Sequence, residues 1–268
     1  MKAVDFNYNG ILASDSGVMI CRFDSSSGFE TVGHGSQISF NTTPLQNGNK
    51  FALTSAMYDE CAEYTFQVCK FACGSDIMPF TIDEQRKIYR WLNRKDGYFP
   101  LRIIQDGYEN IYFEGSFNIL AIEWEGLVFG YELTFITDRP FALHDMVKFN
   151  ISITDTQKTY SIYDISDEIG CIYPNIKITC LESGTLKIHN GAEDRTTIID
   201  NCSVGEVITI DKYLNVSTSL DSHKIQNDFN FIYLRIANAF KNRKNLLTFS
   251  IKCNVKIEYN PIVKGVGL

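Results

Sequence analysis

The side chains of this 268-residue chain that could do chemistry are few and dispersed. Hydrolysis by a nucleophile needs a Ser or Cys, a base and an orienting acid. Four histidines could supply the base, at positions 34, 144, 189 and 223. No G-x-S-x-G turn accompanies them, and His34, in Gly33-His34-Gly35-Ser36, only superficially resembles an oxyanion loop. We interpret that stretch as a polar loop, and we expect no catalytic residue and no enzyme.

Metal and cofactor chemistry lacks its usual patterns. Cys69 and Cys73 share a C-x₃-C spacing, with Cys61 before them. A structural zinc site needs a second close pair of Cys or His, and none follows at a usable spacing. The phosphate-binding patterns G-x-G-x-x-G and G-x-x-x-x-G-K-[ST] are absent from the sequence. We therefore expect neither a metal site nor a cofactor.

Two groups of carboxylates could form a catalytic or a calcium-binding site. Glu123 and Glu125 flank Trp124 and could form the acid pair of a glycosidase. Gly126 follows directly, however, so we interpret both as solvated residues at a hairpin end. The second group comprises Asp164, Asp167 and Glu168. A calcium loop would need more oxygen ligands at alternate positions, so an acidic turn is the favoured interpretation.

Charge, apolar runs and cysteine content limit the binding partners and the compartment that we expect for this protein. The net charge of −7 argues against nucleic acid, whose binders usually carry a basic patch or stripe. Residues 1–7 contain no apolar run, so we expect no signal peptide. No window approaches the ~20 apolar residues that span a bilayer, so we expect no membrane insertion. The eight cysteines are then expected to be free, mostly buried thiols in a reducing cytoplasm.

The chain is expected to be mainly β. Its 19 Phe and 14 Tyr favour sheet. Leu247–Ile257 alternates apolar and polar residues throughout, which predicts one half-buried strand that closes a sandwich. Phe231–Ala237 is predicted to be another strand. We place a boundary near residue 145, between an N-terminal domain, residues 1–145, and a C-terminal β-sandwich, residues 146–268.

One helix is well signalled in the N-terminal domain. Thr81 and Glu84 fit a capping box, in which each side chain bonds the backbone N–H of the other residue. Ile88, Trp91 and Leu92 then recur at helical spacing and predict a buried stripe. We expect Trp91 to be a core anchor and not a ligand platform.

Four stretches, taken in order, resemble the distal tail (Dit) protein family of long-tailed bacteriophages, encoded by many prophages of Gram-positive bacteria. The opening Phe6–Ile11 resembles the start of the family's first domain. The helix with Arg90–Leu92 leads into Gly97–Leu101. The closing strands of that domain resemble Tyr112–Gly115 and Leu133–Phe141. The galectin-like C-terminal sandwich of the family resembles Ser183–Asn190, Gly205–Asp211 and Asp228–Phe231. The chain departs from many relatives at Asn41–Asn49, where they carry a basic-acidic glycine motif.

The resemblance implies a structural protein of the virion, at the tail tip, assembled in the bacterial cytoplasm. N-terminal domains would form a homo-hexameric ring that joins the major tail tube protein to tail-associated fibre or lysin proteins or to a baseplate. C-terminal galectin-like sandwiches would project and anchor receptor-binding proteins. Residues 24–60 are expected to form an arm or long hairpin that lies across a neighbouring subunit, with apolar contacts at Ile38, Phe40, Phe51 and Leu53.

Two alternatives stay open. Galectin-like sandwiches can bind sugars on an aromatic platform, so the C-terminal half could be a carbohydrate-binding module for host glycans. Its candidate platform residues are Tyr160, Tyr163, Tyr173, Tyr213, Tyr233 and Tyr259. A hydrolase that digests the host envelope is disfavoured, because the catalytic constellation it requires is missing.

Overall fold

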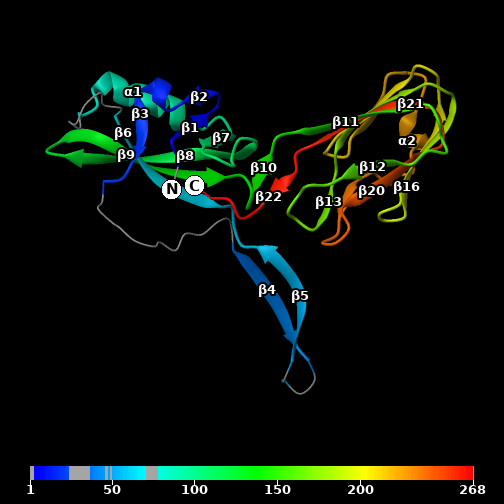
Figure 1. Cartoon of the computed structure of the whole chain (residues 1–268), viewed down its shortest axis with the longest axis horizontal. Coiled ribbons are helices and arrows are strands. Elements are labelled where there is room, and N and C mark those ends of the chain that lie inside the picture. Colours follow the sequence, from blue (N-terminus) through cyan, green and yellow to red (C-terminus); the bar gives the residue numbers. More distant parts are fainter. Residues whose placement is uncertain (1–2, 24–36, 46–47, 49, 71–77, 268) are drawn as a thin grey trace. The chain divides into compact units, whose positions relative to one another are not determined.

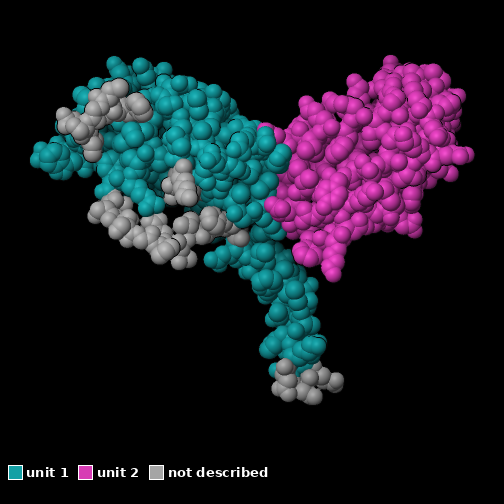
Figure 2. Space-filling view, in the orientation of Figure 1, with its two compact units in different colours: residues 1–144, 263–268 teal, residues 145–262 magenta. Residues whose placement is uncertain are grey.

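The structure is a computed structural model that describes residues 3–23, 37–45, 48, 50–70 and 78–267. The chain divides into two compact units, as Figure 2 shows. Unit 1 comprises residues 1–144 and 263–268, and unit 2 comprises residues 145–262. Residues 263–268 therefore belong to unit 1, although they follow unit 2 in the chain. In the described part, no helix has the length and apolar character needed to cross a membrane.

An antiparallel sheet forms the body of unit 1 (Figure 1). Its strand order is β2-β1-β7-β8-β9-β6-β3, and β10 pairs with both β8 and β22. The strands are β1 (Asp5–Tyr8), β2 (Ile11–Leu12), β3 (Val18–Cys21), β6 (Glu63–Lys70), β7 (Phe99–Ile104), β8 (Ile111–Trp124), β9 (Leu127–Thr137), β10 (Ala142–His144) and β22 (Ile262–Val263). A short 3₁₀ turn, η1 (Ser14–Ser16), leads from β2 into β3.

Helix α1 (Ile82–Leu92) begins and packs as predicted. The Thr81 hydroxyl accepts the Glu84 N–H at 3.4 Å, and the Glu84 carboxylate accepts the Thr81 N–H at 2.8 Å. Ile88, Trp91 and Leu92 are its buried residues. The Trp91 indole N–H donates to the Tyr8 carbonyl at 3.0 Å, so the expectation of a core anchor is confirmed.

The core of unit 1 is aromatic, which explains much of the Phe and Tyr content. Phe6 stacks on Trp91 with ring centroids 5.7 Å apart, and Phe117 meets Phe135 at 4.8 Å. Gly115 on β8 lies where the packing leaves no room for a side chain. A Cβ there would come within 2.3 Å of the Ile136 carbonyl oxygen and 2.6 Å of the Phe135 ring. The aromatic packing therefore depends on a glycine at this position.

A separate hairpin of unit 1 consists of β4 (Ile38–Pro44) and β5 (Phe51–Tyr58). Within the described part of the chain, these two strands pair only with each other (Figure 1). Most of their residues are exposed. The described part of the predicted arm is thus a hairpin that lies outside the core, as expected. Residues 24–36, which the same expectation covered, lie outside the described residues.

Unit 2 is a sandwich of two antiparallel sheets. One has the order β11-β21-β14-β17-β18 and the other β12-β20-β15-β16. The strands of the first are β11 (Val147–Ile153), β14 (Asn175–Cys180), β17 (Val207–Ile210), β18 (Val216–Thr218) and β21 (Cys253–Tyr259). Those of the second are β12 (Tyr160–Tyr163), β15 (Gly184–Asn190), β16 (Arg195–Cys202) and β20 (Lys244–Phe249). A small ladder of β13 (Gly170–Ile172) with β19 (Ile236–Asn238) and the short helix α2 (Ile225–Asp228) complete it.

The inner faces of both sheets share one core, which is rich in isoleucine. Ile162, Ile188 and Leu247 from the four-stranded sheet lie in the same cluster as Ile178 and Ile257 from the five-stranded sheet. The alternation of buried and exposed residues along these strands is typical of a sandwich.

The prediction of a single strand at Leu247–Ile257 is wrong, although its burial pattern is right. The segment contains the end of β20 and the start of β21, which belong to different sheets, and Ser250–Lys252 carries the chain across. Ile251 within the crossing is itself buried. The alternation continues because both strands face the same core, so a pattern of period two cannot reveal the change of sheet.

The strand predicted at Phe231–Ala237 is also mostly wrong. Only its last two residues belong to β19, and Phe231 has a left-handed φ of 55°. The carbonyls of Tyr233 and Arg235 are bonded by side chains instead of by a neighbouring strand. Side-chain bonds from Asn190 and Arg195, which lie about 40 residues earlier in the sequence, thus take the place of the ladder that the apolar pattern predicted.

Candidate functional site

The structure describes three of the four candidate histidines, and each lies in a different part of the chain. His34 and Cys73 lie outside the described residues. His144 ends β10 in unit 1, and His189 lies on β15 in unit 2, with its Nδ1 3.0 Å from the Thr196 hydroxyl. In the described residues, no group of three or more His, Cys, Asp or Glu side chains could hold a metal ion.

His223 is buried between two carboxylates of unit 2. Its Nδ1 lies 2.6 Å from Oε1 of the fully buried Glu206, and its Nε2 lies 3.2 Å from Oδ2 of Asp228. The Glu206 carboxylate also accepts the Ser203 N–H at 2.9 Å and the Thr218 hydroxyl. The cluster joins the segment around β17 and β18 to α2.

The charges of this cluster stabilise one another. Burial acts to lower the pKa of His223, but the hydrogen bond and charge of Glu206 outweigh it and raise the pKa. Burial acts to raise the pKa of Glu206, yet bonds from Thr218, Ser203 and His223 lower it. Among the described residues, no Ser, Thr or Cys side chain is bonded to the imidazole, so the arrangement is that of a buried ion pair. Sequence spacing gave no signal for it, because Glu206 and His223 meet only through the fold.

Asp164 of the acidic turn is held by hydrogen bonds from neighbouring side chains of unit 2. Asp164 is fully buried, and its carboxylate accepts the Tyr259 hydroxyl at 3.0 Å, the Ser166 hydroxyl at 2.8 Å and the Asn238 amide at 2.8 Å. Desolvation and the Asp164 carboxylate raise the pKa of Tyr259. The Asp164 oxygens are therefore occupied by protein donors, which gives this residue a structural role.

The pair of Glu residues lies at a hairpin end, as interpreted from Gly126. Trp124 pairs with Leu127 across the turn between β8 and β9. Glu125 and Gly126 both have left-handed φ angles, 51° and 76°. Glu123, Trp124 and Glu125 are all exposed there.

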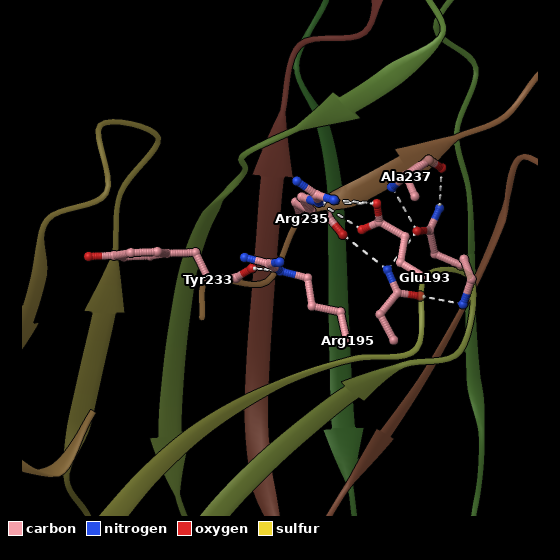
Figure 3. A network of polar contacts seen from close by, with 8 residues as sticks. Glu193, Arg195, Tyr233, Arg235 and Ala237 are labelled. Carbon is pink, nitrogen blue, oxygen red and sulfur yellow. Dashed lines mark hydrogen bonds and ion pairs between the residues drawn. The ribbon is translucent and has the colours of Figure 1, made fainter. Parts of the chain in front are cut away.

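A larger polar network in unit 2 also consists of side chains that bond other protein groups (Figure 3). The Arg235 guanidinium forms two bonds to the Glu193 carboxylate, at 2.7 and 2.8 Å. Asn190 is fully buried, and its amide donates to the Arg235 carbonyl at 3.0 Å and to the Asn245 side-chain oxygen at 2.8 Å. The Arg195 guanidinium donates to the Tyr233 carbonyl at 3.1 Å. These bonds hold the turn after β15 against the segment before β19.

The proposed tyrosine platform does not form one surface. Tyr259 is buried, and Tyr160 and Tyr233 pack against the core. Tyr163 and Tyr213 are the most exposed of the six, but Tyr163 lies on β12 and Tyr213 in the turn between β17 and β18 of the other sheet. A sugar ring could not stack on several of these side chains at once.

The hairpin β4–β5 carries an exposed apolar face. A bulge in β5 leaves no residue of β4 directly opposite Thr54, so Thr42 pairs with Leu53 and Pro44 with Phe51. Residues directly opposite share a face. The bulge therefore brings Phe51 and Leu53 onto the face of Phe40, which pairs with Ala56.

The opposite face of the hairpin is more polar, with Ser39, Asn41, Thr43 and Ser55 on it beside Met57. On the apolar face, Phe40, Phe51 and Leu53 are 63%, 62% and 58% exposed. A two-stranded hairpin is at best marginally stable in water without a surface to cover one face. The apolar face of β4–β5 is thus a candidate docking surface, which the sequence indicated only in part because the bulge is invisible there.

Comparison with known families defines the class. Residues 1–139 match the model of a family described as phage tail protein N-terminal domain. Residues 141–259 match the family described as phage tail C-terminal domain. These matches span most of the chain, so it belongs to these phage tail proteins.

The particular fold is that of Dit. The chain superposes on the crystal structure of the Dit (gp 19.1) protein of phage SPP1 with a TM-score of 0.66 at 12% identity. The match covers 97% of this chain and 99% of that one. The resemblance to the Dit family is confirmed in the fold. No curated protein matches the chain closely enough to count as a relative.

Proposed function

We propose that this protein is a distal tail protein that forms a homo-hexameric ring, the hub between the tail tube and the tail tip. Unit 1 would form the ring, and the galectin-like sandwich of unit 2, residues 145–262, would face outwards and hold host-adsorption proteins. The SPP1 Dit protein, whose fold the chain shares, is described as a paradigm of the hub of an adsorption apparatus in phages that infect Gram-positive bacteria. The proposed role is structural and not enzymatic, in a virion assembled in the bacterial cytoplasm and encoded by a prophage.

The observation that carries this proposal is the apolar face of the hairpin β4–β5. A closed ring is a heterologous assembly, in which each subunit offers one surface and accepts a different one. Phe40, Phe51 and Leu53 supply a surface that the described part of the same chain leaves exposed. Burying such side chains on a neighbour is favourable by roughly 25 cal/mol per Å² of apolar area.

Light scattering after size-exclusion chromatography tests the ring. The intact chain should reach six times its mass of 30.5 kDa on concentration, or on addition of its tail tube or tail-tip partners. Negative-stain images should show a six-fold ring with a central opening. The double variant Phe40→Ser/Phe51→Ser should stay monomeric under the same conditions.

A matched control alters the other face of the same hairpin. Asn41→Ala/Thr43→Ala should assemble as the unchanged chain does, because both side chains lie on the more polar face. A chain that stays monomeric with its tail partners would contradict the ring. Equal loss of assembly in both double variants would contradict the role of the apolar face.

A further inference from the structure

The outward face of the five-stranded sheet carries a continuous polar row. Strand register aligns one residue from each strand, in the order β11, β21, β14, β17 and β18. These residues are Asn150, Lys256, Lys177, Thr209 and Ser217. Their chain neighbours Ile178, Ile208 and Ile257 point into the core, so the row faces solvent.

Two lysines lie side by side at the centre of this row. Lys177 and Lys256 are directly opposite each other on β14 and β21. Like charges in that position destabilise a sheet. The Lys256 ammonium lies 2.8 Å from Glu258, but Lys177 has no ion pair within the part of the chain that the structure describes. A repulsive pair with one uncompensated charge is what an anionic ligand would relieve.

The face is positive in a chain that is negative overall. Its ionisable side chains are Lys148, Lys177, Lys256 and Glu258, and Glu258 interacts with two of these lysines. The chain as a whole has a net charge of −7. Charge of the opposite sign is thus concentrated on one sheet face, where it attracts anions over about a Debye length.

An open pocket of about 270 Å³ lies on this face. Its lining includes both lysines of the row together with Asn150, Ser152, Thr179 and Asn254. Ser152 donates to the Asn254 side-chain oxygen at 2.7 Å, which holds two of these groups in place. Amides and hydroxyls both donate and accept hydrogen bonds, as the hydroxyl groups of a ligand require.

The composition of the pocket selects among partners. Protein interfaces are enriched in aromatic residues, Met and Arg and depleted in Lys. The outward side chains at this pocket are instead lysines and small polar residues, because its two aliphatic residues, Ile151 and Val255, face the core. Nucleic-acid affinity grows with the number of phosphates that are neutralised, and the pocket offers two cations. One anionic group on a hydroxyl-rich molecule fits both the charge and the neutral donors.

We propose that this pocket binds an anionic saccharide or polyol, with Lys177 and Lys256 holding its phosphate or carboxylate and Asn150, Ser152, Thr179 and Asn254 bonding its hydroxyl groups. The site differs from the tyrosine platform, since no aromatic ring lines it. It is independent of the hairpin and the ring, so its failure leaves the proposed hub intact.

Isothermal titration calorimetry on the full chain tests the site with four probes. Glucose 6-phosphate and glucuronate carry an anion with hydroxyl groups, glucose carries only the hydroxyl groups, and inorganic phosphate carries only the anion. Both sugar anions should bind at low salt at least about tenfold more tightly than glucose or phosphate. Binding should weaken at high salt.

Lys177→Gln should weaken binding of both sugar anions about tenfold, the effect of losing one charged hydrogen bond. Lys187→Gln is the matched control: it removes the same charge from an exposed lysine on β15, and it should change nothing. Thermal unfolding checks both variants. Lys177→Gln should be at least as stable as the unchanged chain, because it removes the like-charge pair.

Four outcomes would overturn the proposal. One is the absence of any heat with the two sugar anions. Another is equal binding of inorganic phosphate, which would mean an adventitious ion only. The third is equal weakening by Lys177→Gln and Lys187→Gln. Binding of an acidic peptide such as polyglutamate in place of the sugar anions would also overturn it, in favour of a protein partner.

Discussion

The two units bury different chemistry and expose different chemistry. The core of unit 1 is built on aromatic rings such as Phe6, Trp91 and Phe117, whereas isoleucine dominates the core of unit 2. At the surface, unit 1 offers the apolar hairpin face with Phe40 and Phe51. Unit 2 offers a sheet face whose outward side chains are polar or charged.

The two units differ in how their apolar surface is covered. In unit 2 the inner faces of the two sheets cover each other, and the outward strand residues of the five-stranded sheet are mostly polar or charged. Unit 1 has a hairpin, β4–β5, whose apolar face the described core does not cover, which is the surface that the proposed ring would bury. The sequence helps to separate the two experimentally, because both tryptophans, Trp91 and Trp124, lie in unit 1. Tryptophan fluorescence therefore follows unit 1, and circular dichroism follows both units.

The largest effect is expected from Phe117→Ala in the aromatic core of unit 1. Phe117 is buried and contacts the rings of Phe6, Tyr8, Phe66 and Phe135. Its loss should lower the free energy of unfolding by about 4 kcal/mol, in the range for buried aromatic truncations. Denaturant titration followed by tryptophan fluorescence measures the change.

Ile178→Val provides the comparison in unit 2. Ile178 is fully buried, and losing one methylene should lower stability by about 1 kcal/mol. The change should appear in circular dichroism and leave the fluorescence transition in place. A matching shift of both signals would show that the two units unfold together, and the contrast between their cores would lose its meaning.

Gly115→Ala should follow, at about 3 kcal/mol in unit 1. The new Cβ would lie 2.3 Å from the Ile136 carbonyl oxygen, so backbone must move to admit it. Gly191→Ala is the matched substitution in unit 2, where the nearest atoms are 3.7 Å away, and it should be nearly neutral. If Gly115→Ala were equally neutral by fluorescence-detected unfolding, the tight strand packing in unit 1 would be contradicted.

Sequence patterns predicted structure correctly where it depends on residues close together in the chain. They failed where the structure depends on contacts between distant segments. The capping box placed α1 correctly because Thr81 and Glu84 satisfy backbone groups only three residues apart. The alternation at Leu247–Ile257 predicted burial but not the crossing at Ser250–Lys252, because both sheets share one core. The same limit hid the bulge at Thr54, which decides the side on which Phe51 and Leu53 lie.

The candidate sites show that limit more strongly. The register of β14 against β21 is needed to place Lys177 beside Lys256, and no spacing in the chain reveals it. His223 and Glu206 are likewise joined only by the fold. The sequence shows which catalytic motifs are absent. It does not reveal a surface whose residues come from separate strands, because those residues are distant in the chain.

The buried ion pair should make the stability of unit 2 depend on pH. The pKa of His223 is raised in the folded state, so its contribution is complete below the unfolded value of about 6.5 and is lost as the pH rises through the folded value. The pKa of Glu206 is lowered, so its contribution is present above about 4.3 and is lost as the pH falls through its folded value. The cluster therefore stabilises unit 2 most between these two limits.

His223→Gln tests this assignment. It should lower the stability of unit 2 by about 2 kcal/mol near pH 6, because it removes charged hydrogen bonds from the buried Glu206. The difference from the unchanged chain should shrink towards pH 9. Denaturant titrations by circular dichroism at several pH values measure it, with fluorescence as the control from unit 1. A difference that is constant from pH 6 to pH 9 would rule out titration of His223 as its cause.

The smallest effect on folding is expected where the effect on assembly is largest. Phe40→Ser/Phe51→Ser should change the free energy of unfolding of the dilute, monomeric chain by less than about 0.5 kcal/mol, because both side chains are mostly exposed. The aromatic core reported by Trp91 does not include them. A loss of several kcal/mol in the free energy of unfolding measured by fluorescence would mean that the hairpin packs against its own subunit. The contrast between the covered core of unit 2 and the uncovered hairpin face of unit 1 would then fail. An unchanged transition combined with lost association would place the contribution of these two rings between subunits.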